Sequence, residues 1–95
     1  MVIGVLQLDL RLHGPQNLKQ KRGVLQKLLA RCRNRFPVSC AEVGSQDLWQ
    51  RTLLGFAVVS SSEQVAAPIL SRLEEDILAS GNVDLISAET EFVHY

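Results

Sequence analysis

The sequence contains few of the residues from which disulfide-rich, metal-binding or nucleotide-binding domains are built. Its two cysteines, Cys32 and Cys40, are too few for a disulfide framework, and no C-x-x-C motif or nearby histidine indicates a zinc site. The six glycines are scattered singly, which excludes a glycine-rich phosphate-binding loop. The longest apolar run, residues 53–59, is far shorter than the roughly 20 residues of a membrane-spanning helix. We therefore expect no cofactor, no metal and no membrane insertion.

Acidic residues are also absent from one long stretch. From Leu10 to Arg35 there are eight basic residues and no acidic ones, whereas from Phe36 to Tyr95 there are two basic residues and nine acidic ones. The formal net charge is nevertheless zero. Such a division indicates either an anionic partner for the first half or a chain that pairs its own two halves.

The length of the chain, 95 residues, suits a single two-layer domain covering residues 1–95 and leaves no room for two cores. The N-terminus runs directly into an alternating strand pattern and lacks the positively charged start of a signal peptide. We therefore expect a cytoplasmic protein with free, buried thiols.

Hydrophobic periodicity predicts six elements. Strands are expected at 2–12, 38–43, 53–60 and 83–95, and helices at 17–36 and between the serines at 60–62 and Gly81-Asn82. The 38–43 strand alternates imperfectly, which indicates a bulge or an edge position. Both helices must cover the same sheet face to bury the leucines of the first strand. The order therefore predicts an α+β, ferredoxin-like βαββαβ fold, with a four-stranded antiparallel sheet in the order 4-1-3-2.

The helix ends carry capping signals. Asn17 is a good N-cap residue for the first helix, with Gln20 as its capping partner. For the second helix, Ser61 and Gln64 are expected to form a capping box. The buried stripe expected for that helix consists of Val65, Ile69, Leu73 and Ile77.

The first helix holds the strongest functional signal. It contains seven of the ten basic residues, namely Lys19, Lys21, Arg22, Lys27, Arg31, Arg33 and Arg35. The arginines of the last turn suit the negative end of the helix dipole, but the cations of the first two turns oppose its positive end. Three cations at the end of the helix where the dipole disfavours them indicate a functional site or a partner elsewhere in the fold.

Two explanations remain open for the cations at the start of this helix. They can converge on an anion such as a nucleic-acid phosphate, or they can pair with Glu42 or Asp47. Helical phasing puts Lys21 near the buried side, which favours a structural ion pair for Lys21 and an open role for Lys19. Arg22 fits either explanation equally.

The only tryptophan, Trp49, lies in a predicted loop next to Arg51. Such a residue can close the core, which is the interpretation we favour, or it can stack on a base. The open sheet face offers Glu89 and Glu91, and only Phe56 can add an aromatic there, so RNA binding through this face is disfavoured.

Several segments together resemble the YlxP-like family, bacterial proteins of unknown function. These segments are MVIGVLQLDLRLHG at the N-terminus, NLKQKR at 17–22, FPVSCAEV at 36–43, QDLWQR at 46–51 and LGFAVVS at 54–60. The resemblance implies a small ferredoxin-like cytosolic protein whose gene lies among those for translation initiation and ribosome maturation. It therefore implies a role near the ribosome or RNA by association, and it assigns a role to no residue.

Three functions follow, in order of preference. The first is a non-enzymatic binding domain for RNA or a ribosomal particle, with contacts from Lys19, Arg22, Lys27, Arg31 and Arg35, and with Arg51 and Trp49 at the rim. The second is a homo-oligomeric interaction module, in which the acidic sheet face meets the basic helix of another copy or the third strand buries its second face in a dimer. The third is a small-ligand or enzymatic site near Glu42, Asp47 and Arg51.

Overall fold

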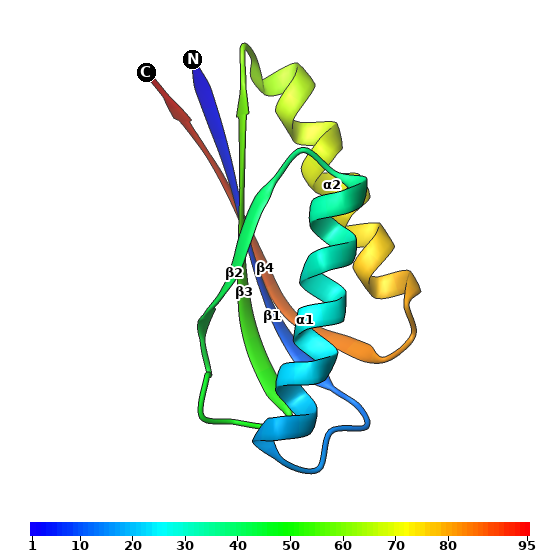
Figure 1. The fold of residues 1–95 in the computed structure, drawn as a ribbon. Coiled ribbons are helices and arrows are strands. Elements are labelled where there is room, and N and C mark those ends of the chain that lie inside the picture. The colour runs from blue at the N-terminus through cyan, green and yellow to red at the C-terminus, as the bar shows by residue number, and fades with distance from the viewer.

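The computed structural model describes residues 1–95 as one sheet and two helices. The elements follow one another as β1 (Val2–Leu12), α1 (Leu18–Arg35), β2 (Ser39–Gly44), β3 (Arg51–Ser60), α2 (Glu63–Ala79) and β4 (Val83–His94). The antiparallel sheet has the order β2-β3-β1-β4, and both helices lie on the same side of it (Figure 1). The predicted ferredoxin-like fold is confirmed, because this order is 4-1-3-2 read from the other edge. Neither helix is long and apolar enough to cross a membrane.

The core lies between the sheet and the helices. It is built from alternate residues of the two central strands and from one stripe of each helix, namely Leu6, Leu8, Leu10, Leu12, Leu54, Phe56, Val58, Leu25, Cys32, Ala66, Leu70, Leu73 and Ile77. Burying each large apolar side chain contributes about 1.5–3 kcal/mol before entropic losses. Phe56 is opposite Leu6 and Cys40 and is only 2% exposed. The expectation that Phe56 reaches the open sheet face is therefore wrong.

The N-terminus of α1 is capped as predicted. The Asn17 side chain accepts a hydrogen bond from the Gln20 backbone N–H at 2.8 Å. The Gln20 side chain in turn accepts from the Gln16 backbone N–H at 2.8 Å, one residue further out than in a standard capping box. Phe36 terminates the helix, and its N–H donates to the Cys32 carbonyl.

The N-terminus of α2 differs from the prediction by one residue. Ser62 rather than Ser61 is the N-cap, and its hydroxyl accepts from the Val65 N–H at 3.3 Å, so the expected Ser61–Gln64 box is wrong. Val65, expected to be buried, is 53% exposed, whereas Leu73 and Ile77 are buried as predicted and Ile69 packs against the core. The buried stripe of α2 therefore consists of Ala66, Leu70, Leu73 and Ile77.

The strand β2 forms one edge of the sheet and is irregular, as predicted. Its register with β3 shifts between Glu42 and Gly44. Arg33 of α1 donates to the Cys40 carbonyl at 2.8 Å, which satisfies an acceptor that an edge strand otherwise leaves open. The strand β4 forms the other edge.

Candidate nucleic-acid interface at the start of α1

A buried lysine organises the first turns of α1. The side chain of Lys21 is only 2% exposed, and its Nζ lies 2.8 Å from Glu42 Oε2. The same Nζ donates to the Ser45 carbonyl at 2.7 Å and to the Leu48 carbonyl. These three acceptors match the three donors of an ammonium group. The alternative partner considered for Lys21, Asp47, forms no ion pair.

Glu42 has a second partner on the same side of the sheet. Thr52, which is fully buried, donates its hydroxyl to Glu42 Oε2 at 2.6 Å. Burying a charge costs desolvation free energy, which is offset only if an opposite charge and hydrogen bonds satisfy the group. Lys21, Glu42 and Thr52 meet this condition, since no buried side-chain nitrogen or oxygen lacks a hydrogen-bond partner.

Through its two carbonyl contacts, Lys21 fastens the β2–β3 loop to α1. Ser45 in this loop has a φ of 57°, a left-handed conformation that is unfavourable by about 1–2 kcal/mol for a residue other than glycine. The bond from Lys21 to the Ser45 carbonyl supports that conformation. The loop then presents Leu48 and Trp49 at the surface, 51% and 38% exposed.

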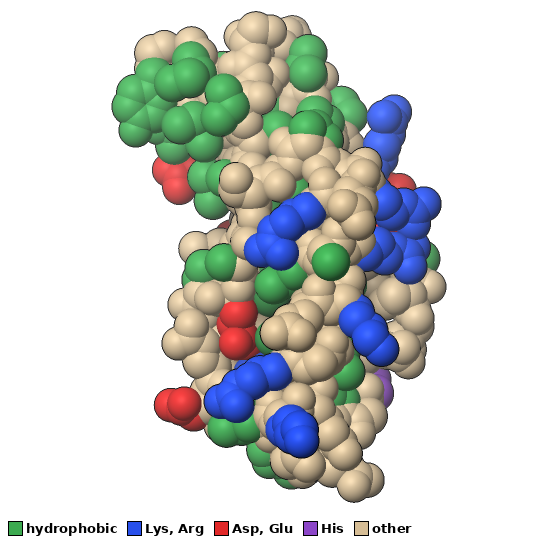
Figure 2. Space-filling view, viewed as in Figure 1, with side chains coloured by type: hydrophobic (Ala, Val, Ile, Leu, Met, Phe, Trp, Pro, Cys, Tyr) green, Lys and Arg blue, Asp and Glu red, His purple; other side chains and the backbone are tan.

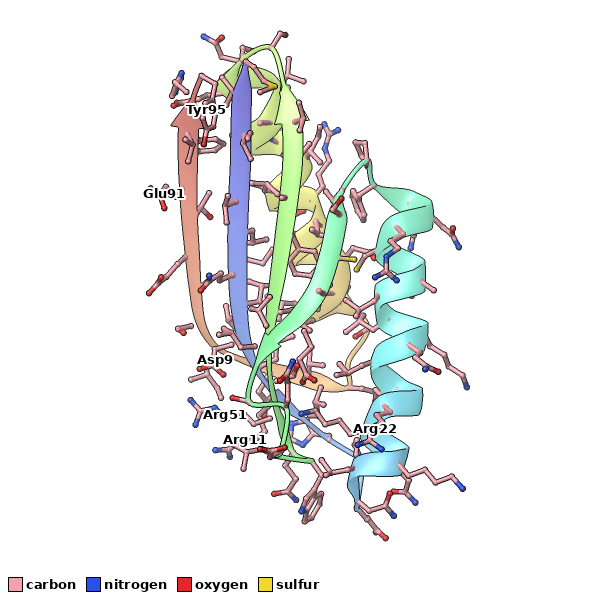
Figure 3. The ribbon with its side chains drawn as sticks, turned by 60° about the vertical axis from the view of Figure 1, so that its left-hand side comes forward. Asp9, Arg11, Arg22, Arg51, Glu91 and Tyr95 are labelled. Carbon is pink, nitrogen blue, oxygen red and sulfur yellow. The ribbon has the colours of Figure 1, made fainter.

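Trp49 lines an open cleft of about 590 Å³ at the end of β1 and the start of β3. The lining residues are Arg11, Leu12, His13, Leu48, Trp49, Gln50 and Arg51. The indole shares this cleft with the core residue Leu12, so it can cover this end of the core or offer a stacking surface. Arg11 and Arg51 lie at the same end of the molecule as Arg22 (Figure 3).

Arg51 is engaged by a carboxylate of the neighbouring strand. Its Nε and Nη2 donate to the two oxygens of Asp9 at 3.1 and 2.9 Å. These hydrogen bonds lower the pKa of Asp9 against a smaller opposing effect of burial, and they raise the pKa of Arg51. Arg51 is therefore neutralised within the protein.

The proposed small-ligand site at Glu42, Asp47 and Arg51 is not assembled. Glu42 faces the helices, where it meets Lys21. Arg51 pairs with Asp9, whose strand neighbours Leu8 and Leu10 point into the core on the other side of the sheet. The two charged groups therefore lie on opposite faces of the sheet and cannot converge on one ligand.

The arginines in the second half of α1 also contact the protein itself. Arg31 binds the two oxygens of Asp76 at 3.0 and 3.2 Å, and Arg35 contacts Asp76 Oδ1 at 2.9 Å. Arg33 is bound to the Cys40 carbonyl. These contacts join α1 to α2 on one flank and to β2 on the other.

The side chains of Lys19, Arg22 and Lys27 are different, because each is exposed and none forms an ion pair or a hydrogen bond within the protein. Lys and Arg side chains project along the exposed side of α1, and the helix contributes no acidic residue (Figure 2). Gly23 lies between Lys19 and Lys27 on the helix surface, and a Cβ added there would meet no atom within 4 Å. No neighbouring backbone in the molecule explains this glycine.

The two cysteines are buried and free. Burial, with a smaller contribution from Cys40, raises the pKa of the Cys32 thiol to about 11, and burial likewise raises the pKa of Cys40. Both thiols therefore remain protonated at neutral pH, and neither is a candidate nucleophile.

The family model of DUF503, described as proteins of unknown function, matches residues 3–90. The chain belongs to the DUF503 family. A relative in Bacillus subtilis (strain 168), the uncharacterized protein YlxP, is 36% identical over 91 residues, covering 96% of this chain and 99% of YlxP. This similarity confirms the YlxP-like resemblance seen in the sequence.

Two solved structures share the fold of this DUF503 protein at 8% sequence identity. Protein YJCS, from structural genomics, has a TM-score of 0.57, with 97% of this chain and 99% of that chain covered. A mutant of SnoaB, a cofactor-independent oxygenase from Streptomyces nogalater, has a TM-score of 0.51, with 99% and 92% covered. At this level of identity the likeness shows the fold alone.

Proposed function

We propose that the exposed face at the start of α1 binds RNA, free or within a ribosomal particle, without catalysing a reaction. The contacts come from Lys19, Arg22 and Lys27, with Trp49 at the rim. One observation supports this most strongly: these three cations have no partner in the protein, although the other four cations of the same helix all have one.

Helix electrostatics strengthen the argument. Lys19 and Arg22 lie in the first two turns, where the helix dipole disfavours a cation by a few tenths to about 1 kcal/mol. Lys21 is subject to the same effect, but Glu42 and two carbonyls offset it. RNA phosphates would offset it for Lys19 and Arg22, and displaced counterions would add a favourable entropy.

The shape of the helix surface suits a nucleic-acid backbone. Lys19, Gly23 and Lys27 follow one another at intervals of four residues and therefore lie along one side of the helix over about 12 Å. Gly23 keeps the surface low between the two lysines, so a sugar-phosphate chain can approach closely while both ammonium groups reach it.

Trp49 adds a stacking surface next to these cations. The β2–β3 loop that carries it is bound to Lys21, one residue before Arg22. An unpaired base stacked on an aromatic side chain typically contributes about 1–3 kcal/mol.

Salt dependence of RNA binding tests the proposal. A fluorescently labelled RNA hairpin is titrated with the protein at 50–300 mM KCl, and binding is followed by anisotropy. For the wild type we expect a log–log slope of about −2 to −3, since three neutralised phosphates contribute about 0.7–0.9 each. Lys19→Gln/Arg22→Gln/Lys27→Gln should abolish most of this slope.

A matched pair of single variants provides the control. Arg22 and Arg72 are both exposed arginines without an ion pair, but Arg72 lies on α2. We expect Arg22→Gln to weaken binding several-fold and Arg72→Gln to leave it within twofold. Equal losses in the two variants, or no binding by the wild type at 50 mM KCl, would overturn the proposal.

A further inference from the structure

The face of the sheet opposite the helices is uncovered, and it is apolar over most of β3 and the first half of β1. Along β3, the residues that alternate with the core residues are apolar from Leu53 onward, namely Leu53, Gly55, Ala57 and Val59, and the first half of β1 adds Ile3 and Val5. The second half of β1 and the start of β3 bring polar residues to the same face, namely Gln7, Asp9, Arg11 and Arg51. Val59 is 67% exposed, and Val43 of β2 is 52% exposed. An antiparallel sheet with one solvated face normally carries polar residues there. A central strand such as β3, apolar on both sides over most of its length, indicates that this part of the open face is buried in the functional state.

The shape of this open sheet face is self-complementary. Small residues of β2 and β3, including Ala41, Gly55 and Ala57, form a shallow hollow of about 330 Å³. Val43 lines the hollow and packs so closely over Gly55 that a Cβ on Gly55 would lie 3.1 Å from it, and Val59 projects from the same face of β3, two residues beyond Ala57. One face thus offers both projecting side chains and a depression that can receive them.

The charges on the open sheet face indicate what kind of molecule covers it. Glu89 and Glu91 of β4 are unpaired, whereas Arg11 lies at the far end of β1, well away from Glu91 (Figure 3). The carboxylates repel a polyanion such as RNA. A second copy of this chain brings an apolar centre and both signs of charge, and in a two-fold arrangement every favourable contact occurs twice.

The area of the face is adequate for a stable dimer. The strands have 11, 6, 10 and 12 residues, and at about 3.3 Å per residue and about 4.8 Å between strands they cover about 600 Å². This area is at the lower end of the about 600–1,000 Å² per partner that stable interfaces bury. We propose that the open sheet face is the interface of a two-fold homodimer.

This inference is independent of the RNA proposal. The helices cover the other side of the sheet, so α1 remains exposed in such a dimer (Figure 1). A dimer therefore presents two cationic faces on its outer sides. Mass measurements test the dimer, and RNA titrations test the helix, so either can fail without the other.

Sedimentation equilibrium of the full chain at 5–200 µM tests the interface. We expect the wild type to give about 21 kDa, twice the chain mass of 10.5 kDa. Val59→Arg puts a charge on the most exposed valine of the face and should raise the dimer dissociation constant at least 100-fold, while leaving the monomer folded by circular dichroism. Ala57→Arg, at the centre of the face, should do the same.

The control is Val65→Arg, which adds the same charge at an exposed valine of α2, outside the interface. It should sediment as the wild type does. If Ala57→Arg does not fold, Val59→Arg still decides the question. A wild type that remains at 10.5 kDa at 200 µM, or a Val59→Arg variant that is folded and still dimeric, would overturn the proposal.

Discussion

The two halves of α1 have similar compositions and opposite uses. In the second half, Arg31 and Arg35 form ion pairs with Asp76 of α2, and Arg33 donates a hydrogen bond to the edge strand β2. In the first half only Lys21 is engaged, and Lys19 and Arg22 point into solvent. The charge of a helix therefore does not by itself reveal a ligand; what matters is whether the rest of the fold supplies an acceptor opposite each cation.

The difference arises from what packs against each half. The second half lies next to α2, whose Asp76 is within reach of two arginines. The first half lies next to the β2–β3 loop, whose backbone carbonyls serve one buried lysine and leave the outward-facing residues unpartnered. The helix dipole accentuates the contrast, because it favours cations at the end where the protein uses them itself.

The largest effect should come from removing the buried cation. Lys21→Met leaves Glu42 as a shielded carboxylate without its partner and deprives the Ser45 and Leu48 carbonyls of their donor. We expect the free energy of unfolding to fall by about 3–5 kcal/mol, measured by urea denaturation. Lys27→Met, the same substitution at an exposed site, should change it by less than about 0.5 kcal/mol. A loss below about 1 kcal/mol for Lys21→Met would show that the buried pair is not structural.

An intermediate effect is expected at the junction between the helices. Asp76→Asn removes the charge that holds Arg31 and Arg35, both of which are about half exposed. Stability should fall by about 1 kcal/mol in thermal or urea unfolding, because exposed pairs contribute little individually. Glu75→Gln, an exposed neighbour without an ion pair, serves as control. Equal stability of the two variants would mean that the ion pairs of Asp76 with Arg31 and Arg35 contribute nothing to stability.

The smallest effect concerns Asp9 and Arg51 at acidic pH. Hydrogen bonding to Arg51 lowers the folded pKa of Asp9 below its ordinary value of 3.8. The resulting stabilisation is complete above the unfolded pKa and is lost as the pH falls through the lower, folded value. Asp9→Asn should therefore destabilise the protein by up to about 1 kcal/mol at pH 7 and by less than that near pH 2. A difference that grows on acidification would contradict the assignment.

The sequence predicted the fold well because its strands alternate clearly. Leu6, Leu8 and Leu10 could face only one side, and the lengths of the connections left a single plausible topology. The register of α2 was less secure, since consecutive serines offered two equivalent caps. Leu73 and Ile77 are buried as predicted, whereas in the first two turns Ala66 and Leu70 replace Val65 and Ile69 as the buried residues.

Only part of the candidate site could be read from the sequence. Helical phasing identified Lys21 as inward-facing, but the sequence left Glu42 and Asp47 as equivalent partners, of which the structure uses Glu42. The carbonyls that complete the coordination of Lys21 are backbone atoms, which leave no residue-type signal. The pairing of Arg31 with Asp76 joins residues 45 positions apart and depends on how two helices pack across the sheet.

RNA affinity in two charge-matched double variants tests the central contrast most directly. Lys19→Gln/Arg22→Gln and Arg31→Gln/Arg35→Gln each remove two positive charges from α1, one pair from each half. Measured against the same labelled RNA hairpin at 100 mM KCl, the first should lose at least tenfold in affinity and the second less than threefold. Equal losses, or a larger loss in the second variant, would contradict the assignment of the exposed start of α1 to the ligand and of its end to the fold.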